Sequence, residues 1–161
     1  MSWTDHYRRQ GALDAVLEFA SREPAGPLPF SEVPDVPELF TSPAEVLLAL
    51  HYRWTLKLTG RIGVAQAEAD RDPSTDPVET VSEAWRAAAS ENPVLRRILD
   101  ANDVETAGEY RMLALAAGLA EPHEPPAEIA RVGAAFLALV RSAPARHRDP
   151  VGLKRKLVTS A

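Results

Sequence analysis

Apolar residues recur at helical spacing in six segments of the chain, and prolines or small polar residues separate these segments. No segment alternates cleanly between apolar and polar positions, so the pattern predicts no β-strand. We therefore expect an all-α fold, a compact bundle of about six helices. The predicted helices cover residues 4–21, 43–70, 77–90, 93–102, 106–118 and 127–143. Asp149-Pro150 is a start signal for one further short helix, to about Val158.

The longest predicted helix, 43–70, is expected to lie at the centre of the bundle. It opens with Ser42-Pro43-Ala44-Glu45, a capping box in which Ser42 accepts from the third amide and Glu45 reaches back. Its main apolar stripe contains Leu47, Leu50, Trp54, Leu58, Ile62 and Ala65. A second stripe on another face contains Leu48, Tyr52 and Leu56. Two apolar faces predict that the helix is packed on more than one side.

The segment 22–41 carries five prolines, a density that excludes a helix or a central strand. Apolar residues are interspersed among these prolines: Leu28, Phe30, Val33, Val36 and Leu39. A disordered linker seldom contains so many large apolar side chains. We therefore expect a Pro-rich extended strap that lies over the outside of the bundle.

Further start and stop signals mark the shorter helices. Asp76-Pro77-Val78-Glu79 repeats the start signal of the long helix, and Thr106 with Glu109 forms another capping box. Gly118 is the predicted C-cap of the helix that Thr106 opens. These signals place the helix boundaries but carry no information on function.

The composition sets limits on the class of protein. The chain has no cysteine, which excludes disulfides, thiolate metal sites and a cysteine nucleophile, and fits a reducing cytoplasm. Its first residues are polar, and its apolar runs, such as 46–50, are too short to span a bilayer. Arg outnumbers Lys fifteen to three in an Ala- and Pro-rich chain, as a G+C-rich bacterial genome would produce. We expect a soluble, cytoplasmic, bacterial protein with no membrane partner.

Charge is unevenly distributed between the body and the C-terminal end. Residues 141–161 carry six basic residues and one acid, so a net charge of −5 for the chain leaves −10 on residues 1–140. We expect a single helical domain, 1–143, followed by a basic C-terminal extension, 144–161. The candidate polyanion contacts are Arg146, Arg148, Lys154, Arg155 and Lys156. We favour docking of this tail on the acidic body or a neighbouring subunit over binding to nucleic acid or a membrane.

No catalytic or metal-binding motif is recognisable in the sequence. None of the four histidines follows an acid at the spacing that di-iron bundles use, and nucleophile-elbow and phosphate-loop motifs are absent. Gly60-Arg61-Ile62-Gly63 has the spacing of a KH-type backbone clamp, but it lies in a predicted helix without the strands that KH modules need. A helix-turn-helix around 102–106 is rejected, because its second helix would present acids to phosphate. No cofactor and no metal are expected.

Two groups of polar residues on the first two long helices are the remaining candidates for ligand or partner contacts. Arg53, Lys57 and Arg61 form a basic row on the long helix, which we expect to make ion pairs within the chain or between subunits. His6, Tyr7, Arg8 and His51 complete the candidate set.

The sequence favours a non-enzymatic protein–protein interaction or regulatory module, whose partner is a second copy of the chain or another protein. One alternative is nucleic-acid or polyanion binding through the basic tail. A second alternative is a small-ligand pocket or an enzyme site between helices 4–21 and 43–70.

Overall fold

The computed structural model describes residues 1–102 and 106–143. Within these ranges the chain is all-helical, with no strand, which confirms the predicted fold class. The helices are α1 (Trp3–Arg22), α2 (Val36–Leu39), α3 (Pro43–Ala69), α4 (Pro77–Glu91), α5 (Pro93–Ala101), α6 (Ala107–Ala116) and α7 (Pro126–Ser142). None of the described helices is both long enough and apolar enough to cross a bilayer. The predicted final helix, 150–158, lies outside the described residues.

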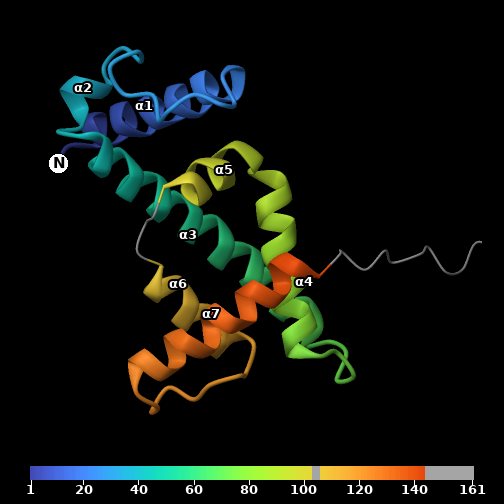
Figure 1. Cartoon of the computed structure of the whole chain (residues 1–161). Helices are drawn as coiled ribbons and strands as arrows, with labels where there is room; N and C mark the ends of the chain where they lie inside the picture. The colour runs from blue at the N-terminus through green and yellow to red at the C-terminus, as the bar shows by residue number, and fades with distance from the viewer. Residues whose placement is uncertain (103–105, 144–161) are drawn as a thin grey trace, which may run out of the picture.

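The central position predicted for the long helix is confirmed. Helix α3 runs diagonally through the molecule, and α1 and α2 lie beside its N-terminal end (Figure 1). Helices α4 and α5 pack along α3. Helices α6 and α7 form a hairpin that lies beside the C-terminal half of α3. Five residues of α3, one per turn, are buried in the main core: Val46, Leu50, Trp54, Leu58 and Ile62. The main stripe read from the sequence is therefore the face that holds the bundle together.

The Pro-rich strap packs on the body as expected, but it contains a helical turn that the proline density was taken to exclude. Val33 and Val36 are buried, and Phe40 is 1% exposed. Pro37 lies within the first turn of α2, where its missing N–H costs no hydrogen bond, so the turn forms despite the prolines. Asp35 precedes this turn with a φ of 70°, a conformation that few residues other than glycine adopt. The strap is thus part of the core and not a loose cover.

The capping box predicted at the start of α3 is confirmed for Ser42 and wrong for Glu45. Ser42 Oγ accepts from the amide of Glu45 at 3.3 Å, as predicted. The Glu45 carboxylate, however, accepts from the amide and hydroxyl of Thr41, at 2.7 and 2.6 Å, and not from the amide of Ser42. The other Glu45 oxygen binds Arg9 of α1 at 3.2 Å, so this carboxylate joins α1 to the start of α3.

The capping box predicted at Thr106 and Glu109 is wrong. The Thr106 side chain makes no capping hydrogen bond, and Glu109 is buried, 3% exposed, with its carboxylate turned into the core. The stop signal at the other end of α6 is confirmed. Gly118 has a φ of 69°, and the amides of Gly118 and Leu119 bond to the carbonyls of Leu115 and Ala114 in a Schellman arrangement.

Helices α6 and α7 cross in backbone contact. A Cβ atom on Gly133 of α7 would overlap the backbone of Tyr110 of α6, so only glycine fits at this crossing. Ala114, Ala120 and Ile129 form a small core of their own inside the hairpin, while Phe136 and Leu137 join the main core. The hairpin is therefore tightly paired and also docked on α3 and α4.

Candidate functional site

The second apolar stripe of α3 is exposed, so no other part of the described chain packs on that side of the helix. Leu48 and Tyr52 are each 65% exposed, Leu56 is 56% exposed and Val64 is 53% exposed. Thr59, Gly60 and Gly63 continue this surface between Leu56 and Val64, and all three are exposed. We call this surface the α3 face, defined by residues Leu48, Tyr52, Leu56, Thr59, Gly60, Gly63 and Val64. It carries no charged residue over more than four turns of helix.

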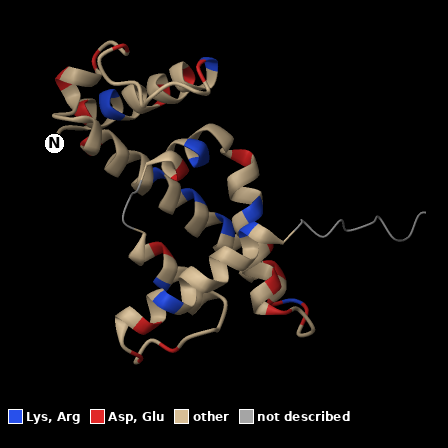
Figure 2. Ribbon diagram, viewed as in Figure 1, with Lys and Arg blue, Asp and Glu red and all other residues tan. Residues whose placement is uncertain are grey.

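The basic row of α3 lies beside this face and is largely used within the molecule. Arg53 bonds to the carboxylate of Asp14 at 2.5 Å and to the side chain of Gln10 at 2.6 Å, both on α1. Arg61 pairs with Glu91 at the end of α4. Lys57 is exposed and makes no ion pair among the described residues. Two of the three expected ion pairs therefore exist inside the chain. Figure 2 shows basic residues gathered where α3, α4, α5 and the end of α7 meet.

The aromatic residues at the start of α1 form a separate exposed cluster. The rings of Trp3, His6 and Tyr7 lie 6.0–6.3 Å apart, and Trp3 and Tyr7 are 77% and 68% exposed. The hollow at His6 is lined by Met1, Ser2 and Trp3 and by no residue of α3. The structure thus places His6 and Tyr7 together, with Arg8 exposed on the same helix and His51 half-buried on α3. Nothing in the described residues joins these groups into one pocket.

A buried polar network lies where α3, α4 and α6 meet. The indole N–H groups of Trp54 and Trp85 both donate to one carboxylate oxygen of Glu109, at 3.2 and 3.3 Å. The two indole rings meet edge to face, with centroids 6.0 Å apart. Buried indole N–H groups need acceptors, and a carboxylate with two N–H donors is partly compensated for its lost hydration. Glu109 therefore fixes how α6 docks on α3 and α4.

Two arginines extend this network to the surface. The guanidinium of Arg96 lies 4.6 Å from the centroid of Trp54, and that of Arg141 lies 5.1 Å from the centroid of Trp85. Both bind the same oxygen of Asp100, at 3.0 and 2.9 Å. Arg96 is 9% exposed, and its buried Nη1 has no hydrogen-bond partner in the described chain. Two positive charges thus share one carboxylate beside a pair of aromatic rings.

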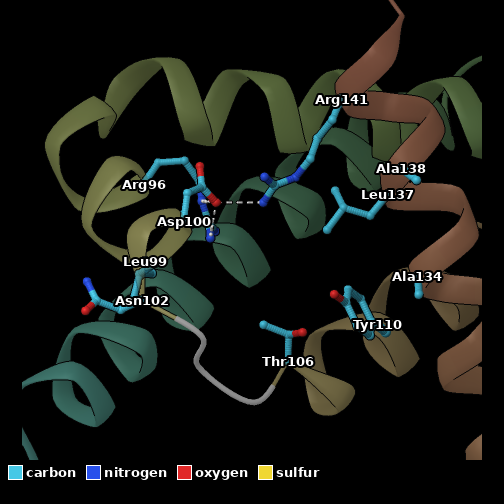
Figure 3. A pocket seen from close by; sticks show the side chains of 10 residues that line it. All are labelled: Arg96, Leu99, Asp100, Asn102, Thr106, Tyr110, Ala134, Leu137, Ala138 and Arg141. Atoms are coloured by element: carbon cyan, nitrogen blue, oxygen red, sulfur yellow. Dashed lines mark hydrogen bonds and ion pairs between the residues drawn. The ribbon is translucent and has the colours of Figure 1, made fainter. Parts of the chain in front are cut away.

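These arginines line a cleft of about 570 Å³ between α5, α6 and α7. Figure 3 shows Arg96, Asp100 and Arg141 on one side of it, opposite Thr106 and Tyr110. Its polar lining also includes Asn102, and its apolar lining is Leu99, Ala134, Leu137 and Ala138. The hydroxyl groups of Thr106 and Tyr110 make no hydrogen bond to any described residue. Of the residues that line this cleft, the sequence analysis singled out Thr106 alone, as a helix cap, and it predicted none as a ligand contact.

Shifted carboxylate pKa values do not gather at the cleft. Hydrogen bonds from Ser2, Phe30, Thr41 and Ser74 lower the pKa values of Asp5, Glu32, Glu45 and Asp72 respectively. These carboxylates lie at helix starts and turns, so the shifts reflect local capping. Among the described residues, no group of three or more His, Asp or Glu side chains is placed to hold a metal ion. The predicted polyanion contacts, Arg146, Arg148, Lys154, Arg155 and Lys156, lie outside the described residues.

Comparison with known proteins gives no relative: no family model, no curated protein and no solved structure matches this chain.

Proposed function

We propose that this protein is a non-enzymatic interaction module that associates with a second copy of itself through the α3 face. The observation that carries the proposal is the row Leu48, Tyr52, Leu56 and Val64, four large apolar side chains that are each more than half exposed on the central helix. Contiguous exposed apolar surface of this kind is typical of interaction sites. Scattered single apolar residues would carry no such meaning.

The size of the face fits a dimer. From their exposed fractions, these four side chains present roughly 450 Å² per copy, so two faces in contact remove on the order of 900 Å². Thr59, Gly60 and Gly63 lie within the same surface and add to this area. The total reaches the range of about 1,000 Å² in which interfaces become specific, at its lower end. We therefore expect a reversible dimer.

The order of large and small residues along the face favours a second copy over an unrelated partner. In an antiparallel pairing with a two-fold axis at Leu56, Tyr52 of each copy lies over Gly60 of the other, and Leu48 lies beside Val64. Nothing stands within 4 Å of a Cβ atom at Gly60, so there is room for the Tyr52 ring. The same register places the exposed Asp70 at the N-terminal end of the opposite α3, where a negative charge is favourable. The face is thus complementary to itself in shape and charge.

Further properties belong to this proposal. A bacterial cytoplasmic setting is supported by the cysteine-free, arginine-rich composition. Polyanion binding through residues 144–161 remains the alternative. It predicts that the protein binds DNA, that this binding weakens as the salt concentration rises, and that it is lost when the tail is removed.

Light scattering after size exclusion tests the association directly. We expect the wild type to pass from monomer to dimer with rising concentration, and Leu56→Glu to remain a monomer, because two carboxylates would meet on the axis. Leu139→Glu is the matched control: Leu139 is 69% exposed, but it lies on α7. A wild type that stays a monomer at millimolar concentration overturns the proposal.

Disulfide trapping tests the antiparallel register, because the chain contains no native cysteine. Leu56→Cys should form a covalent dimer under mild oxidation, since the two copies of residue 56 meet on the axis. Glu68→Cys is also exposed on α3, but it is turned about a third of a turn away and should not crosslink at the same rate. Equal crosslinking by both variants contradicts the register.

A further inference from the structure

The cleft between α5, α6 and α7 has the size and lining of a small-molecule site. Its volume of about 570 Å³ lies within the range of roughly 300–1,000 Å³ that ligand pockets occupy. Arg96, Asp100 and Arg141 face Thr106 and Tyr110 across the cleft, and apolar residues that include Leu99 and Leu137 complete the lining (Figure 3). Apolar residues with a few convergent polar groups are the usual lining of a binding pocket.

The polar groups around the cleft are mainly donors. Arg96 and Arg141 are two cations, and Asp100, the one carboxylate among the described lining residues, is shared between them. The Tyr110 and Thr106 hydroxyls have no partner in the described chain, and Arg141 is 41% exposed at its side chain, so its remaining N–H groups are accessible. A lining with spare positive charge and spare donors is complementary to an anion.

We propose that this cleft binds a small carboxylate with an apolar body, such as an aromatic or short-chain acid. The carboxylate would bind Arg141 and the Tyr110 hydroxyl. The apolar body would lie between Leu99 of α5 and Leu137 of α7, both of which are buried lining residues. Arg96 is the positioning residue: it is held by Trp54 and Asp100, and its charge stays in place when Arg141 turns toward the ligand.

The tryptophan network supplies a built-in reporter for binding. Arg141 lies 5.1 Å from the ring centroid of Trp85, so a ligand that draws Arg141 into the cleft changes the surroundings of that ring. Trp3 is 77% exposed and far along the chain from the cleft, so Trp3→Phe removes the unrelated signal and leaves the two buried indoles.

The probe is benzoate, titrated into the Trp3→Phe protein with the indole N–H resonances and the fluorescence as readouts. We expect saturable shifts of the Trp85 indole N–H with a dissociation constant on the order of 1 mM, as is usual for a ligand of about nine heavy atoms. Acetate has the carboxylate but no aromatic ring, and benzyl alcohol has the aromatic ring but no charge. Each should bind at least about tenfold more weakly. Inorganic phosphate, tested in parallel, distinguishes a general anion site from a carboxylate site.

A pair of arginine variants on α7 completes the test. Arg141→Gln should weaken benzoate binding about tenfold or more, whereas Arg131→Gln should leave it unchanged, because Arg131 is exposed and, among the described residues, pairs with Glu128 of its own helix alone. Circular dichroism and the thermal midpoint check that both variants are folded. The proposal is overturned by the absence of saturable binding up to about 50 mM, by equal binding to both variants, or by phosphate binding more tightly than benzoate.

Discussion

The backbone carbonyl of Tyr110 occupies the space in which residue 133 of α7 would carry a Cβ atom. Gly133→Ala therefore requires α6 and α7 to separate, because the obstacle is backbone and cannot rotate away. We expect a loss of about 3 kcal/mol or more in the free energy of unfolding, at the upper end of what overpacking costs. Urea denaturation followed by circular dichroism measures this loss.

Gly11→Ala is the matched control for that substitution. Gly11 also lies inside a helix, α1, but nothing stands within 4 Å of a Cβ atom there. Alanine should stabilise α1 by roughly 0.5–1 kcal/mol through its higher helix propensity. If both glycine variants changed stability in the same direction, backbone contact at the α6–α7 crossing would not be the cause.

Replacing Glu109 with alanine should lower the free energy of unfolding more than replacing it with glutamine, which removes the charge but keeps a hydrogen-bond acceptor. Glu109→Gln keeps an oxygen that accepts from the indoles of Trp54 and Trp85, so we expect a loss below about 1.5 kcal/mol. Glu109→Ala leaves two buried N–H groups without a partner and opens a cavity, for a loss of about 2–4 kcal/mol. Thermal unfolding monitored by tryptophan fluorescence compares the two. Equal losses would show that the indole hydrogen bonds do not hold the hairpin in place.

Arg53 should contribute more to stability than its neighbour in the basic row. Its guanidinium is half-buried against α1, where it bonds to Asp14 and Gln10. Arg53→Ala should therefore destabilise the protein by about 1–2 kcal/mol. Lys57→Ala, on the same helix and exposed, should change stability by less than about 0.5 kcal/mol. Chemical denaturation of both variants decides whether the α1–α3 contact depends on Arg53.

The stability of the junction between α1 and α3 should fall in acid because of Glu45. Hydrogen bonds from the Thr41 hydroxyl and amide, then the Arg9 guanidinium, lower the pKa of Glu45 in the folded protein. A lowered folded pKa stabilises the protein above the unfolded pKa, about 4.3, and this contribution is lost as the pH falls through the folded value. Glu45→Gln should therefore flatten the fall in thermal midpoint between pH 6 and pH 3. Glu38→Gln should leave it unchanged, since Glu38 makes no side-chain hydrogen bond in the described chain.

Periodicity and capping chemistry predicted the fold class and most helix boundaries, because both are local properties of the chain. The start of α3 after Ser42, the start of α4 after Asp76 and the stop at Gly118 each depend on hydrogen bonds within a few residues. The turn at α2 was missed because proline density was read as excluding helix, although proline is compatible with a first helical turn.

The sites depend on contacts between distant parts of the chain, and the sequence carried little signal for them. Glu109 has the spacing of a capping residue, and only the position of Trp54, 55 residues earlier, shows that its carboxylate turns inward. Arg96 and Asp100 lie at i and i+4, which predicts a helix pair, but Arg141 reaches the same carboxylate from 41 residues away. The second stripe of α3 was recognised, but periodicity cannot distinguish a face covered by the same chain from one left for a partner.

The contacts of Glu109 also bear on the order in which the molecule assembles. Its two hydrogen bonds reach α3 and α4, so the α6–α7 hairpin finds its complete docking site only after those two helices lie side by side. A hairpin docked in any other register would bury a carboxylate without donors, at a cost of several kcal/mol. We therefore expect Glu109 to contribute more to the specificity of hairpin docking than to net stability, because an apolar residue of the same size would tolerate other arrangements of the hairpin.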